Sequence, residues 1–396
     1  MNYLGGDIVL KVIVSHSDDV DAIDAIEEII EDVREQLDGL VPQAGLLFCG
    51  LDFEYDVLLE ELYNEFPDIE LIGGTTDGEV SSTLGYEQGS VVLTLFVSDT
   101  VEIKAGVGKH LSEDIDLATK TAVEQASSKM DTDVKFCFTV YESLTCSAVV
   151  VLESLKRRLG VDITVLGGLA ADDWNMRKTF QFYNNEVLSD SVPLLLFGGQ
   201  VEFSYGVASG WEPIGVQKVV TKVDHNVVHE LDGAPILDFY NHYLGEYSTL
   251  TSNYPLAVFP DVAAHDKFYL RNPAGVVDGT TSIAFFGDIP LHATVQLTEA
   301  TSEKIVEAVE TAVNMAIGNF GDAKLESALV ISCSGRCKVL GINTREEIAL
   351  LQSKLPADCS ISGLYGYGEI APLDKGMESQ FHNGTIVVIL LGESHV

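Results

Sequence analysis

The chain has few basic side chains. Its 396 residues include 61 aspartates and glutamates against 23 lysines and arginines, which gives a formal charge of −38. Such a charge repels phosphate backbones and anionic lipid surfaces, so nucleic acid and membranes are excluded as expected partners. The acidic residues are spread along predicted helix faces, as in 18–38, and this distribution indicates a solvated acidic surface.

Long hydrophobic runs and a basic leader are also missing. The longest apolar runs, such as TIVVILL near the C-terminus, fall far short of the roughly 18 residues that a membrane helix needs. The first residues, MNYLGGDIVLKV, lack the basic region and the cleavage site of a signal peptide. Six cysteines in a chain this long do not form a dense disulfide framework. We therefore expect a soluble, cytoplasmic protein with reduced thiols.

The common motifs of cofactor and metal chemistry are absent as well. No Walker lysine follows the glycine turns, and no GxGxxG opens a helix, which argues against a phosphate cradle. Cys333 and Cys337 have no second cysteine pair and no histidine at finger spacing. No serine lies in a GxSxG turn. The sequence thus predicts no cofactor, no metal site and no hydrolase of the usual kind.

One order of segments occurs three times. In 161–199 a β-branched strand ends at a glycine pair, an acidic and aromatic loop follows, a hairpin turns at Asn184-Asn185, and an apolar strand closes the stretch. Residues 69–98 and 359–393 have the same parts. With the strands and amphipathic helices before each stretch, we predict an α/β fold of mixed β-sheets covered by helices. It would be built from three repeated strand-helix-strand-helix-strand-strand units with a hairpin-rich insertion.

The limits of these units follow from the same patterns. We place the first unit at about 8–98 and the second at 101–199, the insertion at about 200–289, and the third unit at about 290–395. Two local signals lie in the third unit. Asn383-Gly384 is a strong hairpin signal, and Thr344 to Glu347 reads as a capping box that opens a helix.

A series of short segments then suggests a family. They occur in the order LGGLAADD, NNEVLSDS, GWEPIG, ELDGAPILDFYNHYLG, YLRNP, SCSGR, SGLYGYGEIAPL and HNGTIVV. This ordered set resembles the FIST family over about residues 30–395, and the resemblance implies an N-terminal FIST domain at 1–199 and a C-terminal FIST domain at 200–396. It also implies an intracellular sensory module for a small ligand, amino acids being favoured. Because the chain ends just after its last strand, we expect a separate signalling protein as partner.

The strand-end loops supply most of the candidate ligand residues. Missing side chains at Gly167, Gly168, Gly363 and Gly366 let backbone N–H groups approach a bound group, although a sharp turn alone would also require glycine. Acids follow the loops at Asp77 and Glu79, at Asp172 and Asp173, and at Glu369. They could receive a ligand ammonium or cap a neighbouring turn. Tyr365 belongs with Glu369 in the loop GLYGYGEIAP.

Two arginines and one cysteine complete the candidates. Arg271 in YLRNP and Arg336 in SCSGR lie at recurring positions of the resemblance, and a guanidinium can hold a carboxylate by two parallel hydrogen bonds; an ordinary ion pair is the alternative. Cys333 precedes Arg336, and a nearby cation would favour its thiolate. It is a weak candidate nucleophile, the alternative being a buried packing residue.

Three functions remain open from the sequence. The leading hypothesis is a sensory protein that holds an amino acid or related carboxylate, with its carboxylate on Arg271 or Arg336 and its ammonium on Glu369, Asp172 or Asp173. The second is an enzyme that uses Cys333 or the Glu369 loop on a small carboxylate substrate. The third is an interaction scaffold without any small ligand.

Overall fold

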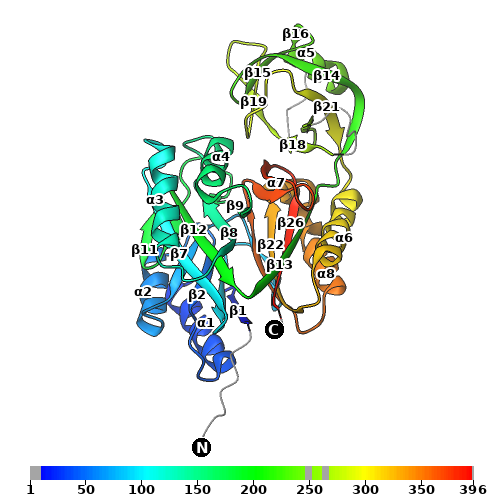
Figure 1. The fold of residues 1–396 in the computed structure, drawn as a ribbon. Coiled ribbons are helices and arrows are strands. Elements are labelled where there is room, and N and C mark those ends of the chain that lie inside the picture. The colour runs from blue at the N-terminus through cyan, green and yellow to red at the C-terminus, as the bar shows by residue number, and fades with distance from the viewer. Residues whose placement is uncertain (1–9, 246–251, 261–266, 395–396) are drawn as a thin grey trace, which may run out of the picture.

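Three six-stranded sheets, with helices on their outer faces, form the larger body of the molecule (Figure 1). The computed structural model describes residues 10–245, 252–260 and 267–394. A smaller lobe with an eight-stranded sheet lies at one end of the body (Figure 1). The predicted α/β fold of mixed sheets is confirmed.

The first unit alternates strands and helices before a short hairpin and a final strand. Its elements are β1 (Lys11–Ser17), α1 (Ala22–Leu37), β2 (Ala44–Cys49), α2 (Tyr55–Glu65), β3 (Glu70–Thr75), β4 (Glu79–Ser81), β5 (Gly85–Glu87) and β6 (Val91–Val97). Helix α1 begins after Asp21, whose carboxylate accepts hydrogen bonds from the N–H groups of Ile23 and Asp24. It ends at Asp38, which adopts the left-handed conformation.

The second unit has the same order of elements. They are β7 (Val101–Lys109), α3 (Ile115–Ser127), β8 (Val134–Tyr141), α4 (Ala148–Leu159), β9 (Thr164–Leu169), β10 (Gln181–Tyr183), β11 (Glu186–Leu188) and β12 (Ser191–Gly199). The turn Asn184-Asn185 joins β10 to β11, which pair antiparallel as predicted.

The third unit is interrupted after its first strand. It comprises β13 (Val201–Ala208), α6 (Ser302–Asn319), β22 (Lys324–Cys333), α7 (Ser334–Leu340), η1 (Gly341–Asn343), α8 (Thr344–Lys354), β23 (Ser360–Gly366), β24 (Glu369–Pro372), β25 (Ser379–His382) and β26 (Ile386–Glu393). The lobe between β13 and α6 contains β14 (Glu212–Asp224), β15 (Val227–Leu231), β16 (Ala234–Pro235), α5 (Ile236–Leu244), β17 (Leu256–Phe259), β18 (Tyr269–Arg271), β19 (Pro273–Val276), β20 (Ile283–Phe285) and β21 (Thr294–Glu299).

The structure corrects the expected limits of the insertion at two strands. Strand β13, expected inside the insertion, belongs to the third unit, and β21, expected inside the third unit, belongs to the lobe. Strand β13 pairs along its whole length with β26 of the third unit. Strand β21 pairs with β14 and β17 inside the lobe. The alternation of apolar residues identified both segments as strands, but the partner of a strand depends on hydrogen bonds to distant residues, which the pattern does not contain.

Each sheet of the body takes four strands from one unit and a hairpin from another. The orders are β1-β6-β2-β3-β10-β11, β7-β12-β8-β9-β24-β25 and β13-β26-β22-β23-β4-β5. The hairpin of the second unit completes the first sheet, that of the third unit completes the second sheet, and that of the first unit completes the third sheet. This exchange joins the three units in a closed ring.

The prediction of a hairpin at Asn383-Gly384 is wrong, because here too the partner of a strand depends on residues that are distant in the sequence. Strand β25, before this turn, pairs with β24, whereas β26, after it, pairs with β13 and β22. The turn carries the chain from the second sheet to the third. A turn signal specifies a local reversal of the chain, and the next strand is free to find another partner.

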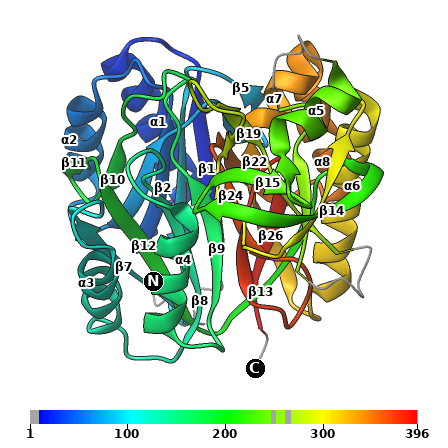
Figure 2. The same cartoon turned by 90° about the horizontal axis from the view of Figure 1, so that it is seen from above.

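The inner faces of the three sheets share one hydrophobic core. Val12 of β1, Phe138 of β8 and Val387 of β26 belong to it. The outer faces are covered by α1 and α2 on the first sheet, α3 and α4 on the second, and α6 and α8 on the third (Figure 2). In the described parts of the chain, no helix combines the length and the apolar composition needed to cross a bilayer.

Glycines in β3, β9 and β23 allow neighbouring strands to come unusually close. A Cβ atom at Gly73, Gly167 or Gly363 would lie about 2 Å from a backbone carbonyl oxygen of the adjacent strand. The oxygens belong to Leu47, Thr139 and Val330, at 1.8, 1.9 and 2.0 Å. The backbone itself would have to move to admit a side chain, so these positions are glycine for steric reasons.

The substitution Gly363→Ala is expected to lower the free energy of unfolding by about 3 kcal/mol or more, because its methyl group has no room beside Val330. Gly318→Ala in helix α6 is the matched control, since no atom lies within 4 Å of the place that its methyl group would take. It should stabilise the protein by about 0.5–1 kcal/mol. Chemical denaturation of both variants measures the difference, and similar free energies would contradict the steric argument.

Candidate functional site

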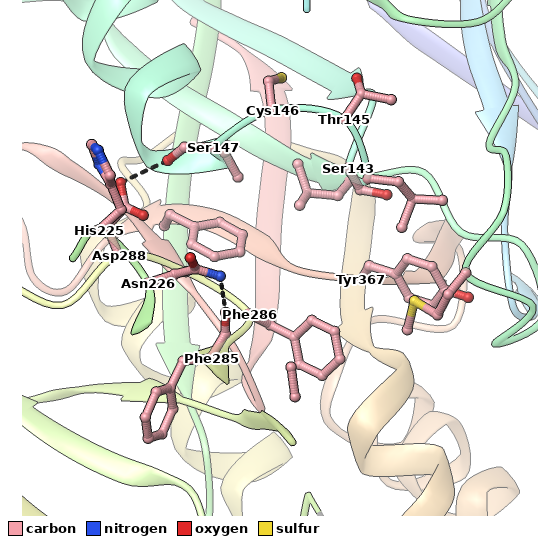
Figure 3. Close-up of a pocket in the computed structure, with 17 residues that line it drawn as sticks. Ser143, Thr145, Cys146, Ser147, His225, Asn226, Phe285, Phe286, Asp288 and Tyr367 are labelled. Atoms are coloured by element: carbon pink, nitrogen blue, oxygen red, sulfur yellow. Dashed lines mark hydrogen bonds between the residues drawn. The ribbon is translucent and has the colours of Figure 1, made fainter. Parts of the chain in front are cut away.

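A cleft of about 520 Å³ lies where the lobe meets the larger body (Figure 3). One wall is the loop 143–147 after β8, together with the start of α4. A second wall is the lobe segment 285–288, and a third is formed by Tyr367 and Phe381 of the third unit. A molecule bound in this cleft would therefore contact the lobe and two units of the body.

One hydrogen bond crosses from the second unit to the lobe at this cleft. The Ser147 hydroxyl donates to Asp288 Oδ2 at 2.8 Å (Figure 3). Ser147 is also the N-cap of α4, since its oxygen accepts a hydrogen bond from the N–H group of Val150. The Asp288 carboxylate consequently lies at the positive end of the α4 dipole.

The loop before α4 is held in place by Glu142. Its buried carboxylate accepts hydrogen bonds from the N–H groups of Leu144 and Thr145, and from the Thr145 hydroxyl at 2.8 Å. The hydroxyl of Ser143, which also lines the cleft, donates to the carbonyl oxygen of Ala170 at 3.0 Å. The wall of the cleft is thus fixed by hydrogen bonds made before any ligand binds.

A second, smaller space of about 20 Å³ adjoins the cleft, and we call it the chamber. Met176, Phe286 and Tyr367 border both spaces. The other residues around the chamber are Trp174, Asn272, Cys333, Ser334, Gly335 and Asn383. Asn272 Oδ1 and Ser334 Oγ are buried and make no hydrogen bond within the described residues.

Two buried carboxyl groups lie behind the chamber. Asp77 interacts with Ser334, and Glu369 interacts with the thiol of Cys333. By strict hydrogen-bond geometry Asp77 Oδ2 and Glu369 Oε1 are unpaired among the described residues, although the Ser334 hydroxyl and the Cys333 thiol lie close enough to lower the pKa of the two groups. Burial raises the pKa of Asp77 to about 7 and that of Glu369 to about 8. Both groups therefore change charge near neutral pH.

Among residues 10–245, 252–260 and 267–394, no three histidine, cysteine, aspartate or glutamate side chains are grouped closely enough to hold a metal ion.

Arg336, predicted as an anion anchor, is fully engaged inside the protein. Its Nε and Nη2 groups donate to Glu347, which is equally buried. The remaining N–H groups reach backbone carbonyl oxygens of Ser209, Gly384 and Ile305. All five N–H groups of the guanidinium have acceptors, and no donor remains for a ligand carboxylate.

The partner of Arg336 also corrects the expected capping box. Glu347 does not turn back to the start of α8, where Asn343 makes no side-chain cap. Its second carboxylate oxygen accepts a hydrogen bond from the Tyr365 hydroxyl at 2.8 Å. Tyr365, another predicted ligand residue, is thereby buried in this ion-pair network. Tertiary pairing replaces the local cap because a buried guanidinium needs a counter-charge.

Arg271 lies directly behind the cleft. Its guanidinium is between the rings of Tyr269 and Phe381, 4.3 and 5.2 Å from their centroids. It donates to the backbone oxygens of Asp288, Leu270 and Phe381. Arg271 therefore holds together two cleft walls, and the described residues offer it no carboxylate ion pair. Burial lowers the pKa of this guanidinium.

The predicted aspartates organise the loop after β9. Asp172 accepts hydrogen bonds from the N–H groups of Met176, Arg177 and Lys178, and from the Tyr367 hydroxyl at 2.6 Å. Asp173 lies at the surface and accepts from Gln88 at 3.0 Å. Their immediate partners are protein groups, and Asp172 positions Tyr367 at the border of cleft and chamber.

The predicted glycines lie within strands where backbones meet. Gly167 and Gly363 face the neighbouring strands described above. A Cβ at Gly168 would lie 2.8 Å from the carbonyl oxygen of Gly368, and one at Gly366 would lie 2.2 Å from that of Leu169. These contacts account for glycine at the four positions through packing alone. Of the predicted site residues, Cys333 lines the chamber, and Glu369 lies beside its thiol.

Several residues of the site were missed from the sequence. Asn272 and Ser334 are each within two positions of a predicted arginine, in the segments RNP and SGR. The sequence therefore contained a signal for both residues, but the positive charge of the neighbouring arginines made these the predicted ligand-binding groups instead. Asp288 and the loop 143–147 carry no motif, and only the packing of the lobe on the body brings them to the cleft.

The FIST N domain matches residues 43–234 of this chain, and the FIST C domain matches residues 237–372. A protein of Methanocaldococcus jannaschii, described as "Uncharacterized protein MJ1623", is 30% identical over 261 residues, which make up 62% of this chain and 50% of that protein. This chain thus spans about half the length of that relative.

Solved structures resemble the chain only distantly. A cyanuric acid hydrolase from A. caulinodans aligns with 97% of this chain and 100% of its own, at 9% identity and a TM-score of 0.37. T. maritima PurL complexed with FGAR aligns with 97% of this chain and 73% of its own, at 9% identity and a TM-score of 0.23. Neither score is high enough to support an argument about this chain.

Removing the buried guanidinium is expected to destabilise the protein strongly. Arg336→Met leaves the Glu347 carboxylate buried without a counter-charge, so the free energy of unfolding should fall by about 3–5 kcal/mol. Arg345→Met is the control, because Arg345 forms an exposed ion pair with Glu87. Loss of that pair should cost about 0.2–1 kcal/mol. Equal losses in urea denaturation would contradict the structural role of Arg336.

Thiol labelling tests the reactive-cysteine hypothesis. Burial raises the pKa of both thiols, that of Cys146 to about 12, but Cys333 is only 3% exposed, whereas Cys146 is partly exposed and lines the cleft. Iodoacetamide at pH 8 should therefore modify Cys146 well before Cys333, as measured by peptide mass spectrometry over time. Cys146→Ser should remove the faster phase. Selective early modification of Cys333 would instead support a thiol enzyme.

Proposed function

The chain belongs to the FIST family, and we propose that it is a sensory protein that binds a small ligand, an amino acid or a related carboxylate, in the cleft between lobe and body. FIST domains are associated with sensory and signal-transduction proteins. In this proposal a separate signalling protein receives the output.

The observation that carries the proposal is the composition of the cleft walls. They come from the second unit, the third unit and the lobe. A ligand that contacts all three has a different affinity for each arrangement of lobe and body, which is the condition for a ligand to shift a conformational equilibrium. The lobe also has a hydrophobic core of its own, built around α5 and its sheet.

The start of α4 supports a carboxylate on the ligand. Backbone N–H groups at a helix N-terminus attract anions, and the Asp288 carboxylate already occupies this position through Ser147. A ligand carboxylate would compete with Asp288 for the same hydroxyl and the same helix end. Displacement of Asp288 would remove a contact between lobe and second unit, and this change would be the signal.

A thermal-unfolding screen of the full chain against amino acids, small carboxylates and nucleotides tests the proposal. A ligand at about 100 times its dissociation constant should add roughly 2.7 kcal/mol, a shift of a few degrees. We expect carboxylate-bearing compounds to stabilise the protein. Asp288→Asn should tighten their binding several-fold because it weakens the competing group, and Ser147→Ala should weaken it.

The matched control is Thr301→Ala. Thr301 is the N-cap of α6, away from the cleft, and its hydroxyl oxygen accepts from the N–H group of Lys304 as that of Ser147 does from Val150. Both N-cap substitutions should cost about 1 kcal/mol of stability. Only Ser147→Ala should change ligand affinity in calorimetry. Failure of every compound to stabilise the chain would overturn the proposed function.

A further inference from the structure

One of the three loops that lead into the exchanged hairpins is much longer than the other two. Residues 76–78 connect β3 to β4, and residues 367–368 connect β23 to β24, whereas residues 170–180 connect β9 to β10. The two short loops show that very few residues are enough to cross from one sheet to the next. The additional residues of the second unit are therefore not required by the fold, and loops on a rigid scaffold are a common place for function.

The middle of this long loop lies over the chamber. Its ends at Ala171 and Thr179 are buried, whereas residues 173–178 between them are exposed or half-buried. Trp174 borders the chamber, and Met176 borders both the chamber and the cleft. Neither side chain belongs to a hydrophobic core cluster of the described residues. Residues 173–178, which we call the lid, thus cover the chamber without being part of the core.

The backbone of the lid is strained. Asp173, Trp174 and Met176 have φ angles of 53°, 59° and 49°, in the left-handed region. This region is unfavourable for residues that carry a side chain, and a bulky residue such as tryptophan seldom adopts it. Such a conformation persists only where contacts with the surrounding structure hold it. The closed lid therefore depends on its partners in the rest of the molecule.

The buried partners of the lid come from the first and third units. The Trp174 N–H group donates to the Tyr367 hydroxyl at 2.6 Å, and this hydroxyl donates to Asp172 at 2.6 Å. The rings of Trp174 and Tyr367 lie 5.6 Å apart. The Asp173 N–H group donates to Asp77 Oδ1 at 2.7 Å. A single hydroxyl, that of Tyr367, thus connects the lid with the carboxylate at which the lid begins.

Two further contacts of the lid lie at the surface. The Gln88 amide donates to Asp173 at 3.0 Å, and the Lys338 ammonium lies 5.0 Å from the centroid of the Trp174 ring. Gln88 and Lys338 are both exposed, so water competes for these contacts. A segment with exposed polar contacts and few buried apolar ones belongs to the least stable parts of a protein.

We propose that the lid opens and closes over the chamber, and that the Tyr367 hydroxyl is its latch. Loss of the latch hydrogen bonds releases the left-handed backbone, and movement of Trp174 and Met176 away from Cys333 joins the chamber to the cleft. The lid does not rest on the proposed function, and its opening is measured without a ligand. A ligand in the cleft would contact Met176 and Tyr367 and shift the lid equilibrium, a consequence that does rest on the proposed function.

Thiol labelling of the unaltered full chain detects the opening. Cys333 lines the chamber and becomes accessible when the lid opens, whereas Cys137, 0% exposed in β8, requires global unfolding. With iodoacetamide at pH 8, Cys333 should react about 100-fold faster than Cys137 or more, because local opening costs less free energy than unfolding. Low concentrations of urea should accelerate Cys137 strongly and Cys333 little, since the lid exposes less surface. Peptide mass spectrometry over time measures both rates.

Tyr367→Phe removes the latch hydroxyl and should raise the Cys333 rate about tenfold, the effect of losing its two hydrogen bonds. Tyr63→Phe is the matched control, because the Tyr63 hydroxyl donates to the carbonyl oxygen of Ile69 at 2.7 Å in the first unit. It should leave the Cys333 rate unchanged. Gln88→Ala removes an exposed contact without touching the core, and should raise the rate about twofold.

Tryptophan fluorescence gives a second readout of the lid. The chain has two tryptophans, and Trp211 is 3% exposed, so acrylamide quenching reports mainly on Trp174. Quenching should increase in Tyr367→Phe and stay unchanged in Tyr63→Phe.

Two results would overturn the lid. In the unaltered chain, they are equal labelling rates of Cys333 and Cys137 with the same dependence on urea; in the variants, equal acceleration of Cys333 by Tyr367→Phe and Tyr63→Phe. The first result needs no substitution, so it decides the question even if Tyr367→Phe fails to fold. Failure of every amino acid and carboxylate to bind would overturn the proposed function alone, because the lid is measured without them.

Discussion

The exchange of hairpins among the three sheets is the constraint on which the rest of the structure depends. A hairpin leaves its own unit and completes the sheet of another, so the loop before it must cross from one sheet to the next. The crossing loops are hydrogen-bonded to one another: the N–H group of Asp77 donates to Tyr365 O, that of Ala171 to Thr75 O, and that of Leu169 to Gly368 O. Residues far apart in the sequence therefore meet at one end of the shared core.

Because the crossing loops meet at this end of the shared core, the buried acidic residues that they carry lie close together. The loops bring Asp77, Asp172 and Tyr367 together, and the first residue of β24 adds Glu369. Arg336 lies nearby, but Glu347 and backbone oxygens occupy its guanidinium completely. The carboxyls behind the chamber keep their raised pKa values because burial outweighs the hydrogen bonds and, for Glu369, the charge of Arg336, all of which lower the pKa.

Much of the fold could be predicted from the sequence because it rests on local patterns. Helical spacing, alternating strands and the Asn184-Asn185 turn specified the elements and their order, and the mixed α/β class followed. The patterns failed where a long-range partner decides the outcome. β13 and β21 were recognised as strands but were placed on the wrong sides of the limits between the insertion and the third unit, and Asn383-Gly384 was assigned to a hairpin that β25 and β26 do not form. Pairing depends on contacts between residues separated by up to hundreds of positions, which periodicity does not record.

For the candidate site, too, the sequence predicted one part and only the tertiary structure revealed the other. The sequence by itself determined the family, the acidic character of the strand-end loops, and the candidates Glu369 and Cys333 beside the chamber. Only the tertiary structure decided that Arg336 is a structural cation, that Arg271 supports the cleft walls, and that Asn272 and Ser334 lie together at the chamber. The physical reason is that residue type sets which hydrogen bonds a side chain can make, whereas packing sets which of them are already made, and a ligand can use only those that remain.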